Sequence, residues 1–137
     1  MNWVLSSLIA AVSFSIMILL YRKLLLLGIN STILNFFIFG FTLIGFTIVI
    51  FATKTQMSVS GTMIILLIIA SLFALAGNYL QVTAYKDAPN PGYVNTLVST
   101  QLVLITVFSV FLYKSDFTWI KFFGIIFVLI GAYLVGR

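Results

Sequence analysis

Five long apolar stretches, separated by loops of only a few residues, account for almost the whole chain. They cover Trp3–Leu27, Ile33–Phe51, Thr62–Tyr85, Tyr93–Tyr113 and Trp119–Val135. Each has roughly the 17 to 25 residues that are needed to cross a hydrocarbon core of about 30 Å. In lipid every backbone N–H and C=O must be satisfied internally, so runs of this length are expected to be helices. The sequence therefore predicts an all-α fold, an integral membrane bundle of five transmembrane helices in a single domain over residues 1–137.

Composition supports a membrane protein and excludes several classes of function. The chain is 63% hydrophobic and 7% charged, with a mean hydropathy of +1.27, far outside the range of soluble domains. Cys and His are absent, which removes disulfides, thiolate chemistry and the commonest metal ligand. The only carboxylates, Asp87 and Asp116, lie in loops. We therefore expect no catalytic residue, no metal site and no cofactor, and we do not expect an enzyme.

The basic residues are scattered along the chain and form no patch of the kind that binds nucleic acid. We expect the partners to be the lipid bilayer and a small-molecule substrate. The expected location is the cell membrane (the inner membrane), with the chain as a multi-pass integral protein. Short polar loops separate the spans, and Asn30 or Ser31 is suited to cap the second helix. Pro89 and Pro91 separate the third span from the fourth.

The distribution of Lys and Arg gives almost no orientation. With five spans the termini lie on opposite faces of the membrane. One face then carries Arg22, Lys23, Lys86 and Arg137, and the other carries Lys54, Lys114 and Lys121. Four against three is a weak bias under the positive-inside rule. Two interpretations remain open: one orientation is narrowly preferred, or the chain inserts both ways and pairs with itself in an antiparallel dimer.

The segment 84–95, which reads AYKDAPNPGYVN, is similar to the junction between the third and fourth helices of EamA-type repeats in the drug/metabolite transporter superfamily. The short turn at Lys114–Phe117 and the following segment GIIFVLIG at 124–131 also resemble that family. The family usually carries a glutamate in the turn before its last helix, whereas Ser115 and Asp116 stand there, which leaves the role of this turn open.

The resemblance implies that full-length relatives have ten helices, arranged as two inverted five-helix repeats around a substrate cavity. This chain resembles one such repeat, which would need a second copy to enclose a site at the membrane midplane. The small multidrug resistance family offers a related arrangement, but its subunits have four helices and an essential glutamate in the first. The first span of this chain has no acidic residue, so that assignment fails.

Polar side chains inside a membrane are costly unless they face protein or water, so their helical spacing predicts a cavity. Four spans each present a stripe of polar or small residues, with Phe39 on the stripe of the second. The candidate substrate-binding residues are Ser13, Asn35, Ser71, Asn78, Gln81, Tyr85, Asn95 and Ser99. The alternative is that these residues only join helices by hydrogen bonds and close packing.

The last span carries a smooth strip of Gly124, Val128 and Gly131 that suits helix–helix contact. We predict this strip as the dimer interface, although packing within the subunit explains it as well. Arg22 and Lys23 lie just before the end of the first span. They are expected to extend to the headgroup region, or alternatively to form a positive rim at the cavity mouth.

Together these features predict a small membrane transporter for a neutral or zwitterionic metabolite, working as an antiparallel homodimer. An organic cation would find no counter-charge within the spans. Two other classes stay open: one subunit of a heteromeric transporter or lipid-linked sugar flippase, or a membrane scaffold that transports nothing.

Overall fold

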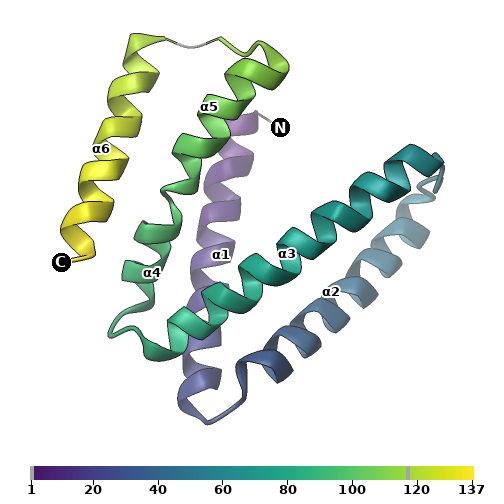
Figure 1. Ribbon diagram of the computed structural model, residues 1–137. Helices are drawn as coiled ribbons and strands as arrows, with labels where there is room; N and C mark the ends of the chain where they lie inside the picture. The colour runs from purple at the N-terminus through teal and green to yellow at the C-terminus, as the bar shows by residue number, and fades with distance from the viewer. Residues whose placement is uncertain (1, 117) are drawn as a thin grey trace. The chain divides into compact units, whose positions relative to one another are not determined.

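The computed structural model describes residues 2–116 and 118–137, and within them every regular element is an α-helix. The helices are α1 (Trp3–Leu26), α2 (Ser31–Thr53), α3 (Gly61–Asp87), α4 (Pro91–Val98), α5 (Gln101–Tyr113) and α6 (Trp119–Val135) (Figure 1). The all-α prediction is confirmed. Four spans are long and apolar enough to cross a membrane when Pro91–Tyr113 is taken as one, and α6 adds a shorter fifth of 17 residues.

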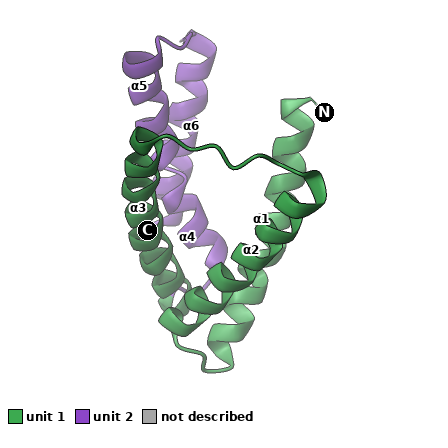
Figure 2. Cartoon of the chain, turned by 90° about the vertical axis from the view of Figure 1, so that its right-hand side faces the viewer, with its two compact units in different colours: residues 1–87 green, residues 88–137 purple. Residues whose placement is uncertain are grey.

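The chain divides into two compact units, Met1–Asp87 and Ala88–Arg137 (Figure 2). The first unit holds α1, α2 and α3, and the second holds α4, α5 and α6. Each unit is described below on its own terms.

Local signals in the sequence set the helix boundaries of the first unit. Asn30 caps α2, because its side-chain oxygen accepts a hydrogen bond from the Thr32 backbone N–H at 2.8 Å. This decides between Asn30 and Ser31 as the capping residue. Gly28 precedes the cap with a φ of +93°, a conformation that side-chain-bearing residues rarely adopt. The tight connection therefore brings the end of α1 next to the start of α2.

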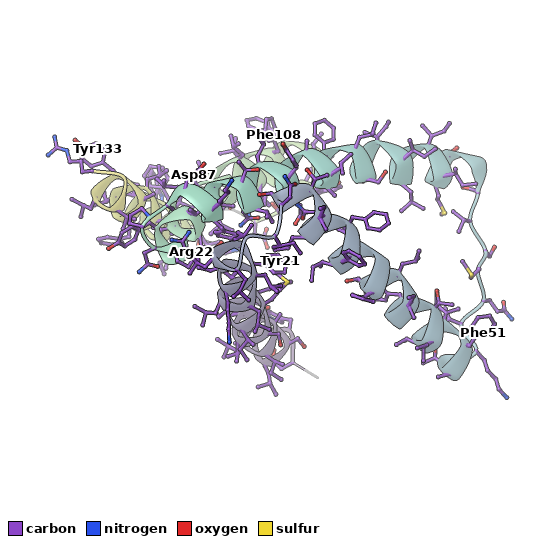
Figure 3. All side chains as sticks on the ribbon, turned by 90° about the horizontal axis from the view of Figure 1, so that it is seen from below. Tyr21, Arg22, Phe51, Asp87, Phe108 and Tyr133 are labelled. Carbon is purple, nitrogen blue, oxygen red and sulfur yellow. The ribbon has the colours of Figure 1, made fainter. Side chains whose placement is uncertain are left out.

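The buried core of the first unit lies at one end of its helices. It comprises Ile18, Tyr21 and Leu25 of α1, Ser31, Leu34 and Asn35 of α2, and Val82 and Tyr85 of α3. These positions fall in the last part of α1, the first part of α2 and the last part of α3. From that packed end α2 and α3 diverge toward the segment 54–60 that joins them, with Tyr21 at the packed end and Phe51 at the splayed end (Figures 2 and 3).

Arg22 joins α1 to the end of α3. Its Nη1 donates hydrogen bonds to the carbonyl oxygens of Tyr85 and Lys86, the latter at 2.8 Å. The last carbonyls of a helix have no partner within the helix and carry its negative dipole end, so a guanidinium stabilises them. The sequence predicted that Arg22 extends to the headgroup region. In the structure its side chain also joins α1 to α3. Lys23 is exposed, in keeping with that expectation.

In the second unit α4 packs against α6. Asn90 caps α4 by accepting from the Gly92 N–H at 2.7 Å, and Pro91 occupies the first turn, where its missing N–H is not needed. The buried side chains are Val94 of α4 and Ala132 of α6. The last span thus has a packing partner within its own unit.

The fourth span covers Pro91–Tyr113, close to the predicted Tyr93–Tyr113, but it is interrupted between α4 and α5, which the sequence did not predict. The helical hydrogen-bond pattern changes at Ser99 and Thr100, where the Thr100 N–H bonds to the carbonyl of Leu97, three residues back, at 3.1 Å. Both hydroxyls also donate to carbonyls of the preceding turn, at 2.8 Å each. Hydroxyls that compete for helix carbonyls can bend or tighten a helix, and these two bonds accompany the break.

Candidate functional site

An open groove of about 550 Å³ lies between α2 and α3 in the first unit. Its lining residues are Thr32, Asn35, Phe36, Phe39, Gly40 and Leu43 of α2, with Ser71, Ala74, Leu75 and Tyr79 of α3. The volume falls within the roughly 300 to 1,000 Å³ that is typical of small-molecule sites. Because α2 and α3 separate beyond the packed end, the groove begins next to the core and runs away from it.

The groove has apolar walls and no charged lining residue. Phe36 and Phe39 supply aromatic rings from α2, and Tyr79 supplies a third from α3. All three rings are partly exposed, Phe36 most of all at 74%. A wall of this kind suits the apolar body of a ligand and gives no counter-charge to an ion.

Two of the predicted site residues, Asn35 and Ser71, come together in this groove although they lie 36 positions apart in the chain. Asn35 is only 7% exposed, and its Nδ2 donates to the carbonyl of Ser31 at 3.0 Å. The Ser71 hydroxyl donates to the carbonyl of Ile68 at 2.8 Å. Each side chain thus donates one hydrogen bond within its own helix.

Ser13 lies in a different groove, of about 440 Å³, lined by α1 residues and by Ile38 of α2. Its hydroxyl donates to the carbonyl of Ile9 at 3.0 Å. Met17 and Tyr21 share this lining, which is likewise almost entirely apolar. The sequence placed Ser13 with the other site residues, but within the first unit the structure separates it from Asn35 and Ser71.

The remaining predicted residues of α3 lie toward the packed end. The Nε2 of Gln81 donates to the Tyr85 hydroxyl at 2.8 Å, and Tyr85 is only 2% exposed. Asn78 is half-buried, and its Nδ2 donates to the carbonyl of Ala74 at 2.8 Å. None of these three side chains lines the groove between α2 and α3.

Asn95 and Ser99 belong to the second unit, where both are half-buried. The Asn95 carbonyl accepts from both the N–H and the hydroxyl of Ser99, at 2.9 and 2.8 Å. These two residues therefore lie at the interruption between α4 and α5. A broken span with polar side chains at the break is a feature of substrate and ion sites in transporters.

The predicted interface residues Gly124, Val128 and Gly131 lie on α6. A Cβ atom added at Gly124 or Gly131 would meet no atom within 4 Å, apart from the immediate helix neighbours. By contrast, a Cβ at Gly136 would lie 3.3 Å from Leu97 of α4. Packing within the unit therefore accounts for a small residue at Gly136 and leaves the surface of the other two glycines open.

Sequence reasoning missed Thr32 and Tyr79 as groove residues. Tyr79 follows Ser71 and Leu75 at steps of four, so the signal was present in the spacing. The stripe predicted from the sequence ran instead through Ser71, Asn78, Gln81 and Tyr85. Asn35 and Phe39, placed together by the sequence, do share the groove-lining face of α2.

The groups that line the groove are mostly apolar. Among the described residues no group of three or more His, Cys, Asp or Glu side chains could hold a metal ion. The polar atoms of the groove are one amide and a few hydroxyls. Their chemistry is that of recognition by hydrogen bonds.

The chain matches the EamA-like transporter family over residues 1–137. No curated protein and no solved structure matches the chain.

Proposed function

Since the chain belongs to the EamA-like transporter family, we propose that it moves a neutral or zwitterionic metabolite across the cell membrane as an antiparallel, dual-topology homodimer. The family consists of membrane transporters of the drug/metabolite type, and the helices are those of a multi-pass membrane protein. The substrate class, the membrane and the dimer are our proposals.

The observation that carries the substrate class is the uncharged lining of the groove between α2 and α3. A charged ligand that enters the hydrocarbon region needs an opposite charge to offset its lost hydration. The described spans supply no carboxylate except Asp87, at the end of α3, and the groove does not include it. A neutral molecule, or a zwitterion that carries its own counter-charge, fits such a lining best.

The proposal of a dimer is supported by three features. Residues 1–137 hold five spans, whereas the resemblance implies that a cavity forms between two sets of five. The near balance of basic residues on the two faces favours insertion in both orientations. The open surface at Gly124 and Gly131 allows a neighbouring backbone to approach α6 closely.

Reconstitution of the purified chain into liposomes tests the function. We expect saturable uptake of at least one neutral or zwitterionic compound from a panel chosen by thermal stabilisation in detergent, and no uptake of tetraphenylphosphonium. Uptake of the cation alone would refute the proposed substrate class. Uptake that needs a second, different subunit would refute the homodimer, and stabilisation by no compound, with no uptake, would indicate a scaffold.

A further inference from the structure

We propose that the groove between α2 and α3 binds a neutral molecule with an apolar, flat body and a single N–H or O–H donor, which the Oδ1 atom of Asn35 accepts. This deepens the proposed function by naming a substrate class and rests on it for the role of the site. The binding itself can be tested without transport.

The hydrogen bond to Ser31 fixes the orientation of the Asn35 amide. A backbone carbonyl can only accept, so the atom of Asn35 that lies 3.0 Å from the Ser31 oxygen is Nδ2. The other amide atom, Oδ1, is therefore directed elsewhere. Asn35 thus keeps Oδ1 as an acceptor, together with the second N–H of Nδ2.

Among the described residues no donor reaches Asn35 Oδ1, and this oxygen is not sealed from its surroundings. Asn35 as a whole is 7% exposed, and it lines the groove. A groove occupant is therefore the partner that we assign to this oxygen. An amide oxygen in a water-poor site is costly to leave without a donor, so an occupant that brings one is favoured.

Ser71 on the opposite wall gives the same preference. Its single hydroxyl hydrogen is used in the bond to the Ile68 carbonyl, which leaves only oxygen lone pairs for a ligand. Ser71 and the Oδ1 atom of Asn35, which line the same groove from α3 and α2, thus both offer an acceptor.

The walls set the shape of the remaining part of the ligand. Phe36, Phe39 and Tyr79 present rings, and Leu75 presents an aliphatic surface. Aromatic side chains prefer offset or edge-to-face contact with other rings, so a flat ring system suits them. Along α2 the lining runs from Thr32 to Leu43, which is about 17 Å at 1.5 Å per residue. The groove therefore reaches from near one membrane surface to about the middle of the span.

Other possible occupants are less complementary to the residues that line the groove. A lipid acyl chain would fill the apolar space but would bring no donor to Asn35. A cation would find aromatic faces but no carboxylate in the lining. A helix from a second copy could cover the groove, and the experiment below distinguishes that case.

Two glycines of α2 supply a matched pair of variants. Gly40 lines the groove, Gly45 does not, and a Cβ added at either would meet no atom within 4 Å. Both are helical residues of the same span, so each tolerates a side chain. Gly40→Leu places a side chain where the ligand would lie, and Gly45→Leu adds the same bulk elsewhere.

The probes are 5-fluoroindole and 1-methyl-5-fluoroindole, which differ in the one N–H donor. Their binding to the chain in lipid nanodiscs is followed by fluorine NMR, with empty nanodiscs subtracted. We expect the N–H compound to bind about three- to tenfold more tightly, the usual worth of one neutral hydrogen bond. Asn35→Leu should abolish this preference, and Gly40→Leu should weaken both probes while Gly45→Leu leaves them unchanged.

Three results would overturn the proposal. The first is equal binding of the two probes to the unmodified chain. The second is a preference for the N–H compound that survives in Asn35→Leu. The third is a change in oligomeric state with Gly40→Leu and no loss of probe binding, which would assign the groove to a second copy.

If Asn35→Leu does not fold, the proposal is still tested by the two probes on the unmodified chain and by the two glycine variants. A failure of transport in liposomes with the probe preference intact would refute the proposed function alone.

Discussion

Replacing Arg22 with Met should destabilise the first unit by about 2 kcal/mol. The change removes two hydrogen bonds from Nη1 to the last carbonyls of α3 while keeping a long apolar stem. A hydrogen bond to a charged group contributes about 1.5 to 3 kcal/mol, and a cation at a helix C-terminus about 0.3 to 1 kcal/mol. We take the lower end for the pair, because both bonds come from one nitrogen and the side chain is only half-buried.

Lys23→Met is the matched control. Lys23 is the next residue, is exposed, and its side chain makes no hydrogen bond to any described residue. Both variants lose one positive charge on the same membrane face, so effects on insertion and on detergent binding cancel in the comparison.

The assay is unfolding in mixed micelles with increasing dodecyl sulfate, followed by far-ultraviolet circular dichroism. Lys23→Met should change the free energy of unfolding by less than about 0.5 kcal/mol, as is usual for an exposed site. Arg22→Lys should lie between the two, because a lysine keeps the positive charge but lacks the planar geometry and the position of Nη1. If Arg22→Met unfolds within about 0.5 kcal/mol of the Lys23 variant, the tie between α1 and α3 is not stabilising.

Three further predictions address other parts of the chain. The double variant Ser99→Ala and Thr100→Ala should make Pro91–Tyr113 continuous, seen as slower amide exchange at residues 100–103; unchanged exchange would place the cause of the break elsewhere. Asn78→Leu, Gln81→Leu and Asn95→Leu should each lower transport in liposomes about two- to tenfold while the chain still inserts. Loss of expression in all three variants would instead show that these side chains stabilise the fold. Gly124→Leu with Gly131→Leu should weaken self-association measured by dilution in lipid, and an unaltered association constant would remove α6 from the interface.

The helices could be predicted from the sequence because apolar length alone decides which segments cross a membrane. The predicted and observed limits of each span agree within about two residues, and Asn30 caps α2 as one of the two expected residues. The break at Ser99 and Thr100 was missed because hydroxyl residues are tolerated in membrane helices. Ser6 and Ser7 also bond to preceding carbonyls and leave α1 continuous, so the residue types alone do not predict a break.

The candidate site was predictable in part. Helical spacing placed Asn35 and Phe39 on one face, but it could not show that α2 and α3 diverge and leave a groove between them. Nor could it show that Arg22 reaches carbonyls more than 60 residues away. Spacing describes one helix at a time, and both features depend on how helices pack against each other.

The antiparallel homodimer is the central claim, and cysteine cross-linking tests it most directly because the chain has no native cysteine. Single cysteines would be placed at exposed positions along α6, at Ile120, Phe127 and Leu134, and oxidised in native membranes. In an antiparallel pair, Phe127 near the middle of α6 should cross-link to its own copy, and Ile120 should cross-link to Leu134 when the two variants are co-expressed. Cross-links of Ile120 to Ile120 and of Leu134 to Leu134, with none between Ile120 and Leu134, would show a parallel dimer and contradict the account.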